Sequence, residues 1–169
     1  MPTPSAKVIA ALEKQAGHEF LASQNYVALS YWCEAHQYSG FARFFKKQAG
    51  EELEHAHKIL KHLADRDVLP KIGAVAAPAG DFKNLTDVAQ AAYDFERANT
   101  AGIHAAYEAA LAEKDYPAQV MLHWFISEQV EEEAWSDKLL VKTREANCAG
   151  ALSTLDRHIE KILAGDAAD

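Results

Sequence analysis

The sequence predicts an all-α protein, folded as a four-helix bundle with one long crossover connection and a short C-terminal fifth helix. Apolar residues recur with a period near 3.6 through almost the whole chain, and strand signals are absent. Two connections between the predicted helices are only a few residues long, whereas a third has about 18 residues. The 169 residues suit a single domain with one sizeable core, spanning residues 1–169.

The first two helices are predicted to form an antiparallel hairpin. The first spans about residues 4–36 and ends before Ser39. Its candidate N-cap is Thr3, with Pro4 at the first helical position. The second helix spans about residues 41–66. Because only a few residues join the two, the chain must reverse direction between them.

The crossover is predicted over about residues 67–84, where Pro70, Gly73, Pro78 and Gly80 exclude a regular helix. Extended at about 3.3 Å per residue, this segment could span roughly 59 Å. A helix of about 27 residues is only roughly 40 Å long. The crossover can therefore run the full length of the bundle, so that the helices before and after it run parallel.

The second hairpin and the fifth helix complete the prediction. The third helix spans about residues 85–114, with Asn84 as its cap, and the fourth spans about 117–147. Their short connection again requires an antiparallel pair. The amphipathic segment at about 151–164 has no room in a four-helix core, so we expect it to pack at an interface.

Composition excludes several classes of function. The net charge of -8 disfavours nucleic acid and anionic membranes as partners and mildly favours cations. No apolar run is long enough to cross a bilayer, and the N-terminus lacks the layout of a signal peptide, so we expect a cytoplasmic protein. Cys33 and Cys148 form no CxxC motif, which argues against a disulfide framework, a thiolate zinc site or a rubredoxin-type iron centre.

Acidic residues interrupt the apolar seam of every long predicted helix. A single inward Glu usually pairs with Lys or Arg, but the seams contain neither. Two carboxylates about 4 Å apart repel by about 4 kcal/mol at an effective dielectric of 20, so four at one level of a core need cations among them. Two divalent metal ions would balance the four inward acids, which are Glu19, Glu52, Glu96 and Glu132.

The spacing of the polar seam residues repeats between the two hairpins. Each hairpin has one Glu followed 33 and 36 positions later by a second and a third polar residue. The two sets are Glu19, Glu52 and His55, and Glu96, Gln129 and Glu132. Glu51 likewise corresponds to Glu128. This pattern is typical of a duplicated helical hairpin and predicts a dinuclear metal site.

These residues resemble those of the ferritins, and specifically the bacterial haem-free ferritins. The resemblance covers the whole chain, through "YVALSYWCEAH", "EELEHAHKILKHL", "DYP", "WFISEQVEEE" and the short fifth helix. Ferritin-like di-iron bundles often carry Glu-x-x-His on two helices. Here the second pair is Gln129-x-x-Glu132, which resembles a ferritin and not a bacterioferritin. Leu53 stands where a bacterioferritin has its haem-ligating Met, so no haem is expected.

The resemblance implies iron storage and detoxification by a ferroxidase. Two Fe(II) would be oxidised by dioxygen or hydrogen peroxide, and Fe(III) would be deposited as mineral inside a homo-oligomeric shell of 24 subunits. Carboxylates with one imidazole suit iron, whereas copper or structural zinc sites use thiolates or more imidazoles.

The resemblance also assigns site residues by matching positions. The first iron takes Glu19, Glu52 and His55. The second takes Glu52, Glu96 and either Gln129 or Glu132, with Glu52 bridging. Tyr26 is placed like the family's tyrosine that donates an electron or hydrogen-bonds a ligand, although core packing is an equal alternative.

A third iron site is implied on the inner side of the dinuclear centre. Its residues would be Glu51, Glu128 and Glu131. The alternative is a solvated acidic helix face. We favour the site because Glu51 and Glu128 occupy equivalent places in the two halves.

Two other functions remain as alternatives. A rubrerythrin-like di-iron peroxidase in a small oligomer would need a thiolate-bound iron, and the cysteines to build one are missing. A non-catalytic helical interaction module would tolerate, or gain stability from, the replacement of Glu52 and Glu96, because buried acids without metal are costly. Miniature ferritins of the starvation type bind metal at a dimer interface and fit poorly.

Overall fold

The computed structural model describes residues 3–78 and 80–164. Five helices and no strand are found in this part of the chain. They are α1 (Ala6–Ala35), α2 (Ser39–Ala64), α3 (Leu85–Ala112), α4 (Tyr116–Glu145) and α5 (Ala149–Ala164). The prediction of an all-α bundle with a short fifth helix is confirmed.

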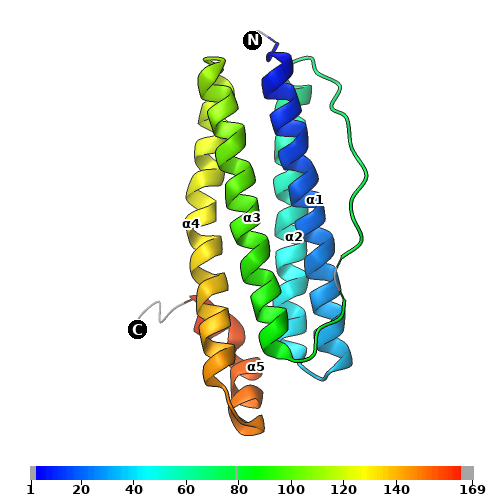
Figure 1. Ribbon diagram of the computed structural model, residues 1–169, viewed down its shortest axis with the longest axis vertical. Helices are drawn as coiled ribbons and strands as arrows, with labels where there is room; N and C mark the ends of the chain where they lie inside the picture. Colours follow the sequence, from blue (N-terminus) through cyan, green and yellow to red (C-terminus); the bar gives the residue numbers. More distant parts are fainter. Residues whose placement is uncertain (1–2, 79, 165–169) are drawn as a thin grey trace.

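The topology of the bundle follows from its connections (Figure 1). α1 packs against α2 and α3, and α3 packs against α4. The long segment between α2 and α3 runs along the outside of the bundle from one end to the other, so α2 and α3 point the same way. α5 packs against α2 and α4 at one end of the bundle. None of the helices in the described residues combines the length and apolar character that a bilayer crossing requires.

The starts of α1, α2, α4 and α5 lie one or two residues from the predicted ones. For α1 and α2 the local structure shows why. α1 begins at Ala6, and its N-cap is Ser5 instead of Thr3. The Ser5 hydroxyl accepts a hydrogen bond of 3.3 Å from the backbone N–H of Val8. The chain reverses direction between α1 and α2 at Gln37, which has a φ of 65°. The reversal needs few residues, so α2 begins at Ser39, two residues before the predicted start.

Gly40, the second residue of α2, is required by the packing of α2 against α5. A Cβ atom at this position would lie 1.8 Å from the carbonyl oxygen of Asp156 in α5. The backbone N–H of the next residue, Phe41, donates to the Asp156 carboxylate at 3.0 Å. The close approach of α2 and α5 is therefore built on a glycine and a hydrogen bond.

The apolar core is divided into two clusters. One contains Tyr26, Leu29, Phe41, Phe45 and Leu139, among others. The other contains Leu12, Ile59, Leu63, Leu122 and Phe125, among others. Along each of the four long helices the inward polar residues fall between the stretches that enter the two clusters. A buried polar layer thus separates two hydrophobic halves.

Candidate dinuclear metal centre

The polar layer is formed by side chains from all four helices of the bundle. The six predicted ligands are all buried, and the most exposed of them, His55, has an exposed fraction of 9%. They are Glu19 from α1, Glu52 and His55 from α2, Glu96 from α3, and Gln129 and Glu132 from α4. Helical periodicity puts each of them on the inward stripe of its helix.

The acids and the histidine form two groups with ligand spacing. One group is Glu19, Glu52 and His55, and the other is Glu52, Glu96 and Glu132. Within each group, one possible ligand atom per residue lies within 4.8 Å of the others. Glu52 belongs to both groups. This geometry fits two adjacent metal ions that share one carboxylate.

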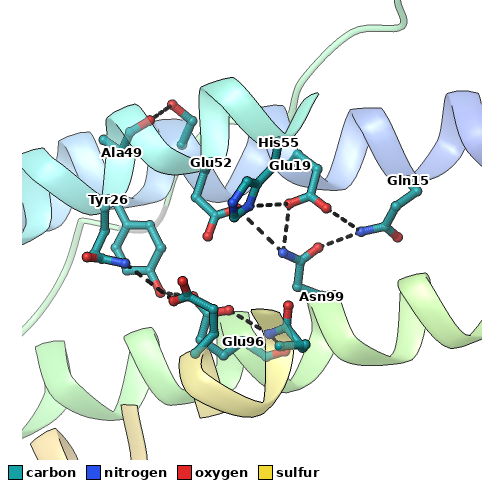
Figure 2. Close-up of polar contacts among 12 residues, drawn as sticks. Gln15, Glu19, Tyr26, Ala49, Glu52, His55, Glu96 and Asn99 are labelled. Atoms are coloured by element: carbon teal, nitrogen blue, oxygen red, sulfur yellow. Dashed lines mark hydrogen bonds and ion pairs between the residues drawn. The ribbon is translucent and has the colours of Figure 1, made fainter. Parts of the chain in front are cut away.

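Neutral donors hold the carboxylates (Figure 2). Glu96 accepts hydrogen bonds from the Tyr26 hydroxyl and, at 2.8 Å, from the Gln129 amide. Glu132 accepts from the Trp135 indole N–H and, at 3.3 Å, from the Gln48 amide.

Glu52 differs from the other three acids in its hydrogen bonding. Its Oε2 lies 3.5 Å from Nδ1 of His55, but its Oε1 is buried without a hydrogen-bond partner among the described residues. A buried carboxylate oxygen without a partner carries a large desolvation cost. A cation bound between the two groups would remove that cost. The donor set, four carboxylates with one imidazole, is one that suits iron.

Burial also changes the protonation of the layer. Desolvation, followed by the charges of Glu96 and Glu19, raises the pKa of Glu52 well above its ordinary value. Desolvation raises the pKa of Glu96 to about 7, although hydrogen bonds from Tyr26 and Gln129 oppose this. Desolvation and the Glu96 charge raise the pKa of Glu132 to about 8. Without metal, the layer therefore retains protons at neutral pH, and a bound cation would displace them.

Tyr26 lies at the centre of the layer and of the adjoining apolar cluster. Its ring stacks on Phe45 with centroids 5.9 Å apart, while its hydroxyl donates to Glu96. Desolvation and the charge of Glu96 raise the pKa of Tyr26 well above 10. The phenol therefore stays protonated and able to donate. Core packing and contact with a predicted ligand are both present in this one side chain.

The acids predicted for a third site lie around a cavity of about 770 Å³ between α2, α4 and α5. Glu51 and Glu128 are half-buried and Glu131 is exposed. The Glu51 carboxylate lies 3.0 Å from Nζ of Lys47. The groups with ligand spacing in the described residues do not include these three acids. Their ligation of metal stays a prediction.

Residues of the candidate centre line two of the cavities found in the described part of the chain, both on the α2 and α4 face. The cavity of about 770 Å³ is lined by Glu132, and a second of about 500 Å³ is lined by His55 and Trp124. Glu51 and Glu128 line both. Each of the two ligand groups thus has one member that borders a cavity on this face.

Sequence reasoning did not assign a role to the amides and the indole that hold the acids. These residues are Gln15, Gln48, Asn99 and Trp135. Gln48 and Asn99 lie on the buried faces of α2 and α3, and a buried amide nearly always has hydrogen-bond partners. Their burial next to the inward acids predicts hydrogen bonds between the amides and these acids, although it does not predict which acid each amide contacts.

Comparison with known proteins agrees with this fold. A family model described as a ferritin-like domain matches residues 9–146. A bacterial non-haem ferritin of Staphylococcus aureus is 37% identical over 130 residues, which cover 77% of this chain and 78% of the relative. A probable bacterial non-haem ferritin-like protein of Haemophilus influenzae is 34% identical over 138 residues, covering 82% and 84% of the two chains.

Solved structures agree as well. An open-pore ferritin of Archaeoglobus fulgidus superposes with a TM-score of 0.91 at 29% identity, covering 94% of this chain and 98% of the other. An engineered closed form of that ferritin gives a TM-score of 0.89 at 30% identity, with coverages of 92% and 96%. The chain belongs to the ferritin-like family. Within that family it is similar to the bacterial non-haem ferritins, so the resemblance inferred from its motifs is confirmed.

The raised pKa values predict how the stability of metal-free protein depends on pH. The folded protein binds more protons than the unfolded chain once the pH exceeds the ordinary Glu value of 4.5. We therefore expect the contribution of these acids to the free energy of unfolding to fall from about pH 4.5 to about pH 8. Denaturant unfolding of metal-free protein across this range measures it.

The comparison variant is Glu132→Gln, which removes one of the raised groups and keeps the side-chain shape. Its free energy of unfolding should fall less steeply with pH than that of the wild type. Identical slopes in the two proteins would contradict the assignment of a raised pKa to Glu132.

Proposed function

We propose that this protein is an iron-storage ferroxidase. It oxidises Fe(II) to Fe(III) with dioxygen or peroxide and deposits ferric mineral inside a cytoplasmic homo-oligomeric shell. The observation that carries the proposal is the position of Glu52. This fully buried acid belongs to both ligand groups, and one of its oxygens has no hydrogen-bond partner among the described residues. The names of the ferritin relatives support the same function.

Iron enters this proposal as the substrate. One Fe(II) would bind Glu19, Glu52 and His55, and the second would bind Glu52, Glu96 and either Glu132 or the amide oxygen of Gln129. Four carboxylates and two Fe(II) ions are electrically balanced, so the cost of burying the acids falls when iron binds. Hard oxygen ligands favour Fe(III) over Fe(II), which assists the oxidation.

The electrons and protons of the reaction are also balanced. Two Fe(II) ions supply two electrons, which reduce dioxygen with two protons to hydrogen peroxide, or hydrogen peroxide with two protons to two water molecules. Glu96 and Glu132, whose pKa values are raised to about 7 and about 8, would release protons when Fe(II) binds. The Tyr26 hydroxyl would hold Glu96 in place during the reaction, and its hydrogen bond to this predicted ligand supports a second role as an electron donor.

The third iron position, at Glu51, Glu128 and Glu131, belongs to this proposal too. These acids line the cavity that Glu132 also lines, which supports a route for iron between the dinuclear centre and the α2 and α4 face.

The ferroxidase proposal is tested by adding two Fe(II) per chain to metal-free protein in air and following ferric absorbance. We expect rapid oxidation by the wild type and its loss, by about 10²-fold or more, in Glu52→Ala/His55→Ala, since the shared ligand and the imidazole are removed together. A matched control is Glu54→Ala/His57→Ala, which changes the same residue types at the same spacing on the exposed side of α2. Equal, slow oxidation in all three proteins would contradict the proposal.

The third position has a separate test in Glu131→Ala. Removing this acid should change the number of Fe(II) oxidised per chain or the turnover rate, while the first rapid two-iron event remains. The control is Asp137→Ala, another exposed acid of α4. A progress curve identical to that of the wild type would count against a third site.

The shell proposal is tested by particle mass. With a chain of 18.6 kDa, a 24-subunit shell has a mass of about 450 kDa by light scattering. A small oligomer would instead favour the rubrerythrin-like alternative.

A further inference from the structure

We propose that Gln15 and Asn99 are positioning residues that fix the carboxylate of Glu19 relative to Glu52, and that Gly102 lacks a side chain because the Gln15 amide occupies that space. The inference rests on the proposed function, in which Glu19 and Glu52 bind the same iron. It concerns groups that do not themselves contact the metal.

The two amides form a short chain of hydrogen bonds that ends on the acids (Figure 2). Nε2 of Gln15 donates to Oε1 of Glu19 at 2.8 Å and to Oδ1 of Asn99 at 2.7 Å. Nδ2 of Asn99 donates to Oε2 of Glu19 at 2.8 Å and to Oε2 of Glu52 at 3.5 Å. Gln15 and Asn99 are buried, with exposed fractions of 1% and 3%.

Each amide sets the orientation of the next group. Both N–H bonds of Gln15 are used, one on a carboxylate and one on the Asn99 carbonyl, so Asn99 must turn its NH₂ group toward the acids. Glu19 then receives one N–H on each oxygen and keeps its remaining lone pairs for a metal. Asn99 also contacts Glu52, so it couples the position of one ligand to that of the shared ligand.

Neutral donors suit this task better than cations would. A Lys or Arg beside Glu19 would neutralise the acid permanently and compete with the metal for it. An amide holds the carboxylate without removing its charge. Ligands that are already oriented lose less conformational entropy when the metal binds.

The position of the Gln15 amide also explains why residue 102 is a glycine. A Cβ atom there would lie 2.2 Å from Oε1 of Gln15, the buried oxygen for which no hydrogen-bond partner is found in the described residues. Glycine inside a helix is destabilising relative to alanine, so a glycine at this position needs a local reason. The open space next to Gly17 shows that not every helical glycine of this protein is tied to such a contact.

The first test is anaerobic titration of metal-free protein with Co(II), a probe whose visible absorption reports its coordination. Wild type should bind two ions per chain at the candidate dinuclear centre, apart from any ion at the proposed third position. In Gly102→Ala the displaced Gln15 amide should weaken one of the two binding events by about 10- to 100-fold, the range found for groups that orient metal ligands. Gly17→Ala is the matched control, and it should bind both ions as the wild type does.

The second test separates positioning from general packing. In a Gln15→Ala background the atom that the new methyl group would meet is absent, so Gly102→Ala should cause no further loss of Co(II) affinity. Thermal unfolding of each metal-free variant identifies any that fails to fold. If Gly102→Ala does not fold, the same 10- to 100-fold loss is required of Gln15→Ala.

The outcomes distinguish this inference from the function on which it rests. A wild type that binds fewer than two Co(II) ions per chain would contradict both. A wild type that binds two, with both affinities unchanged in Gln15→Ala and Gly102→Ala, would overturn the positioning role and leave the ferroxidase proposal intact. Additive losses in the double variant would likewise overturn the role assigned to Gly102.

Discussion

The mutual repulsion of four carboxylates buried at one level of the bundle is the constraint on which the rest of the structure depends. Glu19, Glu52, Glu96 and Glu132 are removed from water, and burial is the largest cause of the raised pKa values of Glu96, about 7, and Glu132, about 8. Such a layer contributes no apolar burial. Stability must come from the two hydrophobic clusters on either side, which hold the helices together whether or not cations are bound in the polar layer.

Neutral hydrogen-bond donors resolve part of this conflict without removing the demand for metal. Phenol, amide and indole groups contact three of the acids through short hydrogen bonds, whereas Glu52 keeps an oxygen with no partner among the described residues. Because this acid is also the one shared by both ligand groups, its carboxylate oxygen without a partner belongs to the residue that two metals would share. The cost of burying this carboxylate is relieved when a cation binds and therefore contributes to the affinity for cations.

The sequence predicted the layer because ligand positions follow from helical periodicity alone. Residues three and four positions apart share a helix face, so Glu52 and His55 had to point where Ile59 and Leu63 point. The repeated intervals then placed Gln129 and Glu132 at the same level. Helix ends were less predictable, because a single contact decides them. Ser5 caps α1 where Thr3 was expected. Gly40 is needed because the carbonyl group of Asp156, in a helix distant in sequence, leaves no room for a side chain.

The hydrogen bonds that hold the acids could not be predicted in the same way. Gln15 and Asn99 are 84 positions apart, and their contact depends on how α1 and α3 are rotated and shifted against each other. Periodicity fixes the face of one helix but not the register between two. The acids predicted for a third site illustrate the same limit, since Glu51 and Glu128 share a cavity wall while ligand spacing depends on their side-chain rotamers.

The two hairpins place their predicted ligands at matching positions but support them with different groups. A shift of 77 positions relates Glu19 to Glu96, yet it relates Gln15 to Ala92 and Tyr26 to Ile103. One acid is therefore held by two amides, and its counterpart by a phenol and one amide. The imidazole is also present on one side only. Two metal ions in this layer would experience different donors, so the internal repeat specifies a pair of positions that are similar in geometry and unequal in chemistry.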